Sequence, residues 1–227
     1  MVPANPCWDD RRTAGLALAR QLLSLAPIPS PRTVLGLPRG GVIVAAPVAE
    51  ALQAPLHSWA VRKLALPDAP EVAIGAVAAG LAGPVVIWDS PERLPLSLRR
   101  ADRVALVEQQ WQELQRRQRL YGDPPADSLR DRWLVVVDDG IATGLTMRAA
   151  LASLRQLRPH GLVLAVPVAD RQVIHDLRPL VESVVVLDPI ASLRAVGNHY
   201  RQFDAVDDQE VLNVLAAARR RLQGAIP

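Results

Sequence analysis

The sequence predicts an α/β fold: a mainly parallel twisted sheet with helices on both faces, in one domain spanning residues 1–227. Three observations favour this fold. Short aliphatic runs alternate with helical patterns along the chain, which is typical of parallel strands joined by crossover helices. Half of the 227 residues are hydrophobic and only 4% are aromatic, so we expect a core of Leu, Val and Ala in buried strands. The length suits one α/β domain, or one that carries a sizeable insertion.

Proline and glycine breaks divide the first half of the chain. The first amphipathic helix ends at the proline cluster PIPSPR, and PRGG separates an aliphatic run from a buried helical one that tolerates Pro47. The run LALPDAPE is predicted to be a loop, and the two short strands after it suit a hairpin. In order, we expect a helix over 9–25, a strand over 33–37, a helix over 42–53, a strand over 56–63, a loop over 64–71 and strands over 72–80 and 84–88.

The second half begins with a long polar helix over residues 97–121. Its apolar residues, such as Val104, Val107, Trp111 and Leu114, recur at heptad-like spacing, and its arginines are interpreted as a solvated face. Strand and helix patterns then alternate. The expected elements are a strand over 134–137, a helix over 144–158, a strand over 162–169, a helix over 170–180, a strand over 183–188 and a helix over 207–223.

Composition narrows the class of protein. The single cysteine, Cys7, excludes an intramolecular disulfide framework and suits a reducing cytosol. The first residues lack the basic start of a signal peptide, and no apolar run reaches the roughly 18 residues of a membrane helix. A net charge of +3 is too small to indicate nucleic-acid binding. We therefore expect a soluble, cytoplasmic protein without a membrane segment and without a nucleic-acid partner.

The histidines show no pattern of a catalytic or metal site. They have neither the spacing of metal ligands nor the partners of a catalytic triad, and Cys7 is interpreted as an incidental thiol. A metallohydrolase or an acyl transferase therefore has no support. The histidines are His57, His160, His175 and His199.

The stretch LVVVDDGIATGLTM, residues 134–147, carries the clearest functional signal. Four apolar residues run into Asp138 and Asp139, whose like charges repel each other, and small residues and threonines then lead into a helix. Ligands of open parallel sheets bind beyond the carboxyl ends of the strands, and the free N–H groups of a helix start favour a phosphate. The two carboxylates can accept hydrogen bonds from vicinal hydroxyls, and the helix start beside them can bind a phosphate. Together they suit a sugar phosphate. The stretch lacks the Gly-Lys-Ser/Thr of a nucleoside-triphosphatase loop and the dinucleotide fingerprint.

This stretch resembles the ribose-phosphate signature of type I phosphoribosyltransferases. The segments LGLPRGGVIVAAPVAEAL, VRKLALPDAPEVAIGAVA and VGNHYRQFDAVDDQEV resemble one bacterial branch of that family, whose base substrate is generally unassigned. The resemblance covers most of the chain, from residue 33 to 214. It implies the type I phosphoribosyltransferase fold with a hood insertion over the second substrate, for which the hairpin and long helix of residues 64–121 are the candidate.

The resemblance also implies a role for each matching residue. Asp138 and Asp139 would hold the ribose hydroxyls, while Arg39 and Lys63, the only lysine of the chain, would stabilise the pyrophosphate leaving group. Mg²⁺ would join through the ribose diol and pyrophosphate, with no direct protein ligand expected. The substrate-binding residues implied are Pro38, Gly40 and Gly41 in the pyrophosphate loop, Arg62, Glu71, Gly140, and Ile141, Ala142, Thr143, Gly144, Leu145 and Thr146 around the 5′-phosphate.

Three of these assignments have an ordinary structural alternative. PRGG is also a common turn, and Lys63 is equally well a solvated surface lysine. Glu71 is either an acid that faces the site and assists the base or a metal, or a solvated loop carboxylate.

The leading functional interpretation is a Mg²⁺-dependent phosphoribosyltransferase, which moves phosphoribosyl between its pyrophosphate and a nitrogenous base. One alternative is a non-catalytic regulatory protein that binds phosphoribosyl pyrophosphate; another is an enzyme with water or phosphate as the acceptor. We expect no winged-helix DNA reader, because the segment before the first strand is predicted to be one helix and the basic tail ARRRLQGAIP is short. Dimers are common in the resembling family, which leaves a homodimer open.

Overall fold

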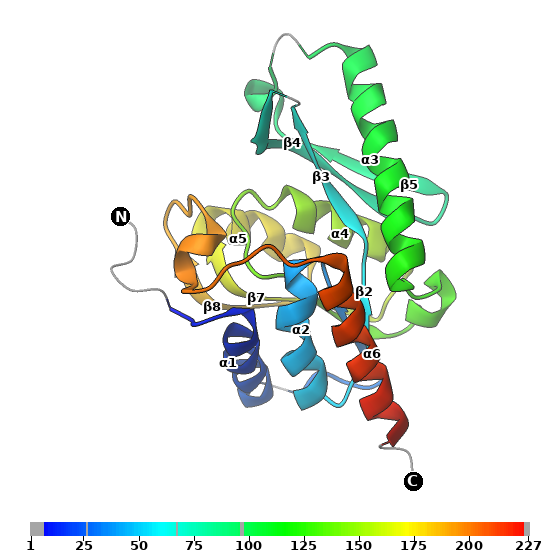
Figure 1. Ribbon diagram of the computed structural model, residues 1–227, viewed down its shortest axis with the longest axis vertical. Coiled ribbons are helices and arrows are strands. Elements are labelled where there is room, and N and C mark those ends of the chain that lie inside the picture. The colour runs from blue at the N-terminus through cyan, green and yellow to red at the C-terminus, as the bar shows by residue number, and fades with distance from the viewer. Residues whose placement is uncertain (1–6, 26, 67, 96–97, 225–227) are drawn as a thin grey trace.

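The computed structural model describes residues 7–25, 27–66, 68–95 and 98–224 (Figure 1). These residues form a five-stranded sheet and a separate three-stranded sheet. Within the described ranges, none of the helices combines the length and apolar character needed to cross a membrane.

The five-stranded sheet has the order β2-β1-β6-β7-β8, and every neighbouring pair is parallel. This confirms the predicted fold class. The chain continues from β1 to β2 on one side and later returns to the other side at β6, so the switch point where ligands bind lies between β1 and β6. The strands are β1 (Arg32–Gly36), β2 (Leu56–Ser58), β6 (Trp133–Val137), β7 (Gly161–Asp170) and β8 (Ser183–Ile190).

Helices cover both faces of this sheet. Successive strand residues point to opposite sides, so apolar side chains of each strand belong to a core on either face. Val135 and Val137 belong to the core beneath α1, α2 and α6, whereas Leu134 and Val136 belong to the core beneath α4 and α5. The helices are α1 (Arg11–Ser24), α2 (Gly40–Ala51), α4 (Leu145–Arg155), α5 (Arg171–Leu177) and α6 (Asp208–Gly224), with short 3₁₀ turns at Pro91–Arg93, Ala126–Leu129, Arg178–Leu180 and Val196–His199 (η4).

The smaller sheet is antiparallel and stands above the main sheet in Figure 1. Its strands pack against the long helix around Leu64, Ile74, Val77 and Leu114, which are at most 1% exposed. The predicted hairpin and the predicted long helix are both confirmed. These elements are β3 (Val61–Leu66), β4 (Ala69–Gly80), β5 (Gly83–Trp88) and α3 (Arg100–Tyr121). Residues 61–121 are called the hood below; they begin three residues before the predicted segment 64–121, and its role over a second substrate stays a prediction.

Two predictions in this region are wrong. The single strand expected over 56–63 is two strands in different sheets, and the loop expected over 64–71 is largely strand. The chain leaves the main sheet at Trp59, whose N–H donates to Gly36 O over 3.1 Å and whose indole Nε1 donates to Ser153 Oγ over 2.8 Å. Ala60 N donates to the Asp123 carboxylate over 2.8 Å. These tertiary hydrogen bonds redirect the backbone, and a local pattern does not reveal them.

Candidate active site

The paired carboxylates lie at the carboxyl end of β6, as the sequence predicts. Asp139 N donates to Asp138 Oδ1 over 2.9 Å. Burial raises the pKa of Asp138 well above its usual range, and the charge of Asp139 raises it further. Burial also raises the pKa of Asp139, while the hydrogen bond and charge of Arg11 act in the opposite direction. The end of β6 therefore holds two acidic side chains that have little contact with solvent, and their negative charges repel each other.

Arg11, from the start of α1, is a partner of this pair that sequence reasoning missed. Its Nε donates to Asp139 Oδ2 over 2.8 Å, and its Nη1 donates to Asp204 O over 2.9 Å. The guanidinium carbon lies 3.8 Å from the ring centroid of Phe203, a distance at which a cation is attracted to the ring face. Arg11 is thus held by contacts with Asp139, Asp204 and Phe203, and its positive charge balances the negative charge of Asp139.

Tyr200 is the second missed residue. Its hydroxyl donates to Asp139 O over 2.6 Å, and its ring packs between those of Trp8 and Phe203, with centroid distances of 5.6 and 5.0 Å. Tyr200 lies in the segment VGNHYRQFD, which carries part of the family resemblance, but no local pattern assigns it this contact. It fixes the backbone that positions the carboxylates.

The loop from Gly140 to Gly144 is anchored to β7. Ile141 N donates to Val168 O and Asp170 N donates to Ile141 O, both over 2.9 Å. Gly144 has φ 75°, and a Cβ there would overlap Val173, so the position requires glycine. Arg148 N donates to Gly144 O over 2.8 Å as α4 begins. Since the first N–H groups of a helix have no intrahelical acceptor, the start of α4 forms a backbone cradle for an anion.

The side chains of the predicted phosphate loop divide into two groups. Ile141 and Leu145 are buried, at 3% and 5% exposure, so only their backbone is available to a ligand. Ala142 and Thr146 are half-buried and Thr143 is exposed. The backbone and the threonine hydroxyls are therefore the groups that this loop offers.

The PRGG loop after β1 packs directly against the carboxylates. Leu37 N donates to Val137 O over 2.9 Å, and the Pro38–Arg39 peptide is cis. A Cβ on Gly40 would overlap Asp139 Oδ2, and one on Gly41 would lie 2.9 Å from Asp138 Oδ1. The structure thus brings together two segments that are separated by about a hundred residues.

Arginines from three elements gather beside this loop. Burial lowers the pKa of Arg62, and the charges of Arg117, Arg39 and Arg116 lower it further, whereas Glu113 raises it. Arg62 Nε donates to Gln110 Oε1 over 3.1 Å. Arg116 and Arg117 belong to α3, whose arginines were interpreted as a solvated face; Arg117 is only 9% exposed. That interpretation is wrong for Arg117, because the charge pattern of a helix does not show which side the body covers.

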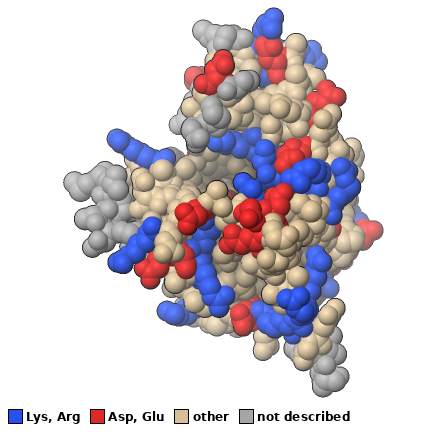
Figure 2. All heavy atoms as spheres, viewed as in Figure 1, with Lys and Arg blue, Asp and Glu red and all other residues tan. Residues whose placement is uncertain are grey.

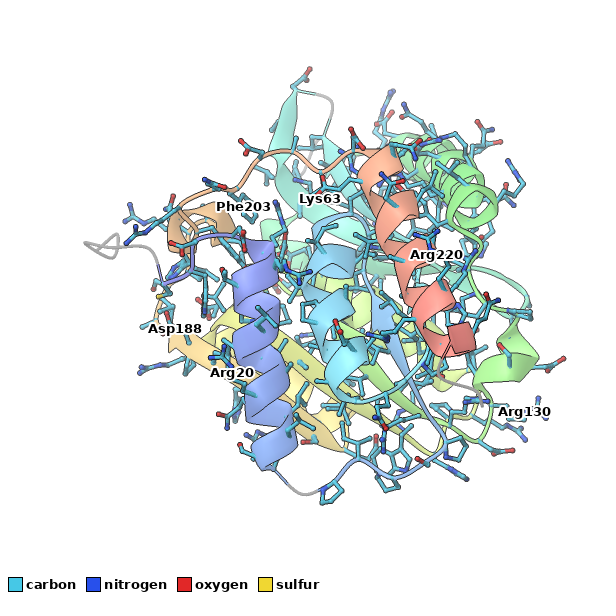
Figure 3. All side chains as sticks on the ribbon, turned by 60° about the horizontal axis from the view of Figure 1, so that its bottom comes forward. Arg20, Lys63, Arg130, Asp188, Phe203 and Arg220 are labelled. Atoms are coloured by element: carbon cyan, nitrogen blue, oxygen red, sulfur yellow. The ribbon has the colours of Figure 1, made fainter. Side chains whose placement is uncertain are left out.

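The contacts described above include neither Lys63 nor Glu71, two of the predicted site residues. Lys63 is exposed on β3 (Figure 3), and its role at a leaving group stays a prediction. Glu71 falls within β4, but its side chain lies outside the described part of the structure, so that assignment is also untested.

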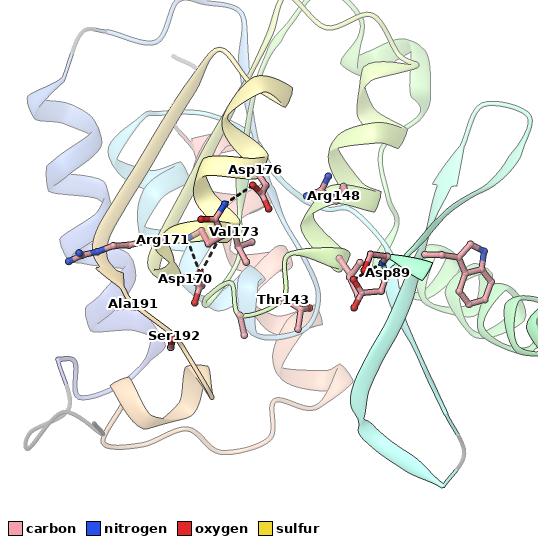
Figure 4. Close-up of a pocket in the computed structure, with 14 residues that line it drawn as sticks. Asp89, Thr143, Arg148, Asp170, Arg171, Val173, Asp176, Ala191 and Ser192 are labelled. Carbon is pink, nitrogen blue, oxygen red and sulfur yellow. Dashed lines mark hydrogen bonds between the residues drawn. The ribbon is translucent and has the colours of Figure 1, made fainter. Parts of the chain in front are cut away.

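A cavity of about 920 Å³ lies between the hood and the phosphate loop. Asp89 at the hood end faces Thr143 across it, and Arg148 and Asp170 line it from the body (Figure 4). Figure 2 shows basic side chains gathered on the hood side of the hollow and acidic ones on its opposite rim. The cavity adjoins the site through the loop residues Ala142, Thr143 and Leu145, whereas neither the carboxylate pair nor the arginine cluster beside the PRGG loop lines it.

Comparison with known proteins identifies the family. A family model described as "Phosphoribosyl transferase domain" matches residues 17–179. Two curated Mycobacterium tuberculosis proteins, from strains H37Rv and CDC 1551, carry the name "Putative phosphoribosyl transferase" and are each 41% identical over 214 residues. The match covers 94% of this chain and 47% of each relative, so the chain spans about half the length of the curated relatives it matches.

Among solved structures, the protein TT1426 from Thermus thermophilus superimposes with a TM-score of 0.68 at 36% identity. The superposition covers 92% of this chain and 98% of TT1426. The family model matches well over half of the residues, and the fold is the mainly parallel sheet predicted for the family. The chain belongs to the phosphoribosyl transferase domain family.

Proposed function

We propose that this domain is a Mg²⁺-dependent phosphoribosyltransferase that transfers phosphoribosyl from phosphoribosyl pyrophosphate to a nitrogenous base. The observation that carries the proposal is the meeting of three groups at one switch point: the carboxylates of Asp138 and Asp139, the start of α4, and the PRGG loop. Each group matches a different part of a single substrate.

The ribose would lie against the carboxylates. Asp138 and Asp139 are acceptors for the vicinal 2′- and 3′-hydroxyls, provided that they are ionised. Their burial disfavours the charged form, so a bound diol and a nearby cation would stabilise that form. Arg11 already does so for Asp139 through the 2.8 Å ion pair.

The 5′-phosphate would occupy the cradle at the start of α4. The backbone from Ala142 to Thr146 would contact the ligand there, where Gly144 adopts a positive φ. N–H groups and the positive end of the helix dipole both favour a dianion. This contact would hold one end of the sugar while the reaction occurs at the other.

Pyrophosphate would leave toward the arginine cluster. Bond cleavage at the anomeric carbon produces an oxocarbenium-like ribose and increases the negative charge on the leaving group. The charge of Arg39 is one of those that lower the pKa of Arg62, and a preorganised cluster of cations lowers the energy of such a state. Lys63 follows Arg62 on β3, so its side chain points to the other face of that strand, and from there it would supply an ammonium group.

The residues present fit Mg²⁺. That ion prefers oxygen ligands, and the carboxylate pair would orient the ribose diol so that its oxygens, with those of the pyrophosphate, face the ion. When bound, Mg²⁺ would neutralise part of the charge on the pyrophosphate.

The acceptor would bind in the cavity between the hood and the phosphate loop. Its volume of about 920 Å³ lies at the upper end of the usual range for small-molecule sites. Polar side chains of Asp89, Thr143 and Arg148 line it, which suits a base with several hydrogen-bonding groups. A purine or pyrimidine is the default acceptor by resemblance.

Turnover tests the proposal. Purified protein with Mg²⁺ and phosphoribosyl pyrophosphate should release pyrophosphate when one member of a panel of purines and pyrimidines is added. Asp139→Asn should abolish that release. Binding of phosphoribosyl pyrophosphate without release for any base would favour the regulatory alternative, and release at the same rate without a base would indicate hydrolysis.

A further inference from the structure

Three potential metal ligands from distant parts of the chain meet on the side of the sheet next to α1. Cys7 precedes α1, Asp188 lies in β8 and His199 ends η4 (Figure 3 labels Asp188). Cys7 Sγ donates to Asp188 Oδ2 over 3.3 Å, and His199 Nδ1 lies 3.6 Å from the same oxygen. All three ligand atoms lie within 4.8 Å of one another.

His199 is the residue that these contacts leave unexplained. It is 3% exposed, and its Nδ1 has no hydrogen-bond partner. A buried polar atom without a partner is rare, because it gives up its hydrogen bonds to water without replacement. The nitrogen lies 3.6 Å from Asp188 Oδ2, and the ligand atoms of His199 and Cys7 lie within 4.8 Å of each other, so a group bound between the three residues would satisfy it.

The spacing fits a tetrahedral ion. Bonds of about 2.0–2.3 Å to N, O and S at tetrahedral angles place ligand atoms about 3.3–3.6 Å apart. The distances from Cys7 Sγ and His199 Nδ1 to Asp188 Oδ2 are 3.3 and 3.6 Å, close to the separations expected for such an ion. The third separation, between Cys7 and His199, is within 4.8 Å, so small side-chain movements would complete the tetrahedral arrangement.

We propose that Cys7, Asp188 and His199 bind one divalent transition-metal ion, with Zn²⁺ as the ion that this ligand set fits. Thiolate, imidazole and carboxylate are the three protein ligand types of zinc, and the thiolate disfavours the hard ions Mg²⁺ and Ca²⁺. Three protein ligands leave a fourth position for water. The sequence shows no metal-site pattern for Cys7 or His199, because the three residues are scattered along the chain.

The exposed position of Cys7 gives the ion access. Burial, together with the hydrogen bond and charge of Asp188, raises the pKa of Cys7 to about 11, so the thiol holds its proton at neutral pH. Zn²⁺ would take the place of that proton: the S–H bond breaks, an S–Zn bond forms, and one proton is released to solvent.

The site would hold the N-terminal segment in place. Cys7 N and Trp8 N donate to His199 O over 3.0 and 3.2 Å, and Arg201 N donates to Trp8 O over 2.9 Å. This segment leads directly into Arg11, and Tyr200 follows His199; both residues contact Asp139. The ion would thus stabilise the two segments that position the carboxylate.

Metal titration tests this inference independently of phosphoribosyl pyrophosphate. Protein without a polyhistidine tag, stripped with a chelator, is titrated with Co²⁺ and then with Zn²⁺. We expect one equivalent of Co²⁺ to give visible bands of tetrahedral cobalt and a sulfur-to-cobalt charge-transfer band, and Zn²⁺ to displace it. Zn²⁺ should also raise the melting temperature, since it binds only the folded form.

Two variants and one control locate the ion. Cys7→Ser should remove the charge-transfer band, and Cys7→Ser or Asp188→Asn should weaken Zn²⁺ binding by at least about tenfold. His175→Asn, at an exposed position of α5, should bind as the unaltered protein does. The proposal is overturned if the protein takes up no stoichiometric ion, or if Cys7→Ser retains the band and the affinity.

Discussion

The guanidinium of Arg11 forms a 2.8 Å ion pair with Asp139, joining the first helix to a strand end that lies 128 residues further along the chain. Their side chains are 12% and 17% exposed. Arg11 lowers the pKa of a carboxyl group that burial raises. The ion pair is therefore what allows an acidic pair to persist at a buried strand end.

Removal of Arg11 should destabilise the protein in a pH-dependent way. In Arg11→Ala the pKa of Asp139 rises further above its unfolded value, so the folded form binds more protons and loses stability as pH increases. We expect a loss of about 3 kcal/mol in the free energy of unfolding near pH 8 and a smaller loss near pH 5. Urea unfolding at both pH values measures it.

Arg12→Ala is the matched control, because Arg12 is the exposed neighbour of Arg11. Its effect should be within about 0.5 kcal/mol at both pH values. An Arg11→Ala loss that is equal at the two pH values would mean that Arg11 acts through packing on Phe203 and not through Asp139.

Asp138→Asn should stabilise the fold. Burial and the charge of Asp139 raise the pKa of Asp138, and asparagine keeps the oxygen that accepts from Asp139 N while losing the charge. We expect the free energy of unfolding to increase by about 1–2 kcal/mol near pH 8. Thermal or urea unfolding checks this; a destabilised variant would show that the carboxylate is a structural group.

Gly40→Ala should disturb the site sterically. The added Cβ would overlap Asp139 Oδ2 and lie 2.7 Å from Arg11 Nε, so either the loop or the ion pair must move. We expect a loss of about 1–3 kcal/mol in stability. Gly224→Ala, which meets nothing within 4 Å among the described atoms, should be nearly neutral in the same unfolding experiment.

Asp123 should make stability depend on pH between about 4 and 6. Burial raises its pKa to about 6, although it accepts from Ser58 Oγ and Ala60 N. The folded form therefore binds more protons than the unfolded form in that range, and stability falls as pH rises through it. Asp123→Asn lacks this loss, so its stability relative to the unaltered protein should increase from about pH 4 to pH 7. A constant difference across this range would contradict the raised pKa.

The parts predicted correctly from the sequence are those with local signals. The strand that ends at Val137, the break at PRGG and the start of a helix after Gly144 each follow from a few consecutive residues. Parallel pairing of β1 and β6 then brings their ends together, because strand ends of a parallel sheet share one edge.

The residues that were missed depend on tertiary contacts. Arg11 lies in a helix with an ordinary amphipathic pattern, and nothing nearby in the sequence indicates Asp139. Trp59 and Ala60 turn the chain out of the main sheet through hydrogen bonds to Ser153 and Asp123. Both partners come from elements far along the chain, so no local window contains the information.

We expect the carboxylate pair to bind the ribose of phosphoribosyl pyrophosphate, and calorimetric titration of the protein with phosphoribosyl pyrophosphate in the presence of Mg²⁺ measures this binding. The unaltered protein should bind, and Asp138→Asn, although at least as stable, should bind about 10- to 100-fold more weakly, because a hydrogen bond to a charged acceptor is lost. Equal affinity of the two proteins, or no binding to either, would contradict the account.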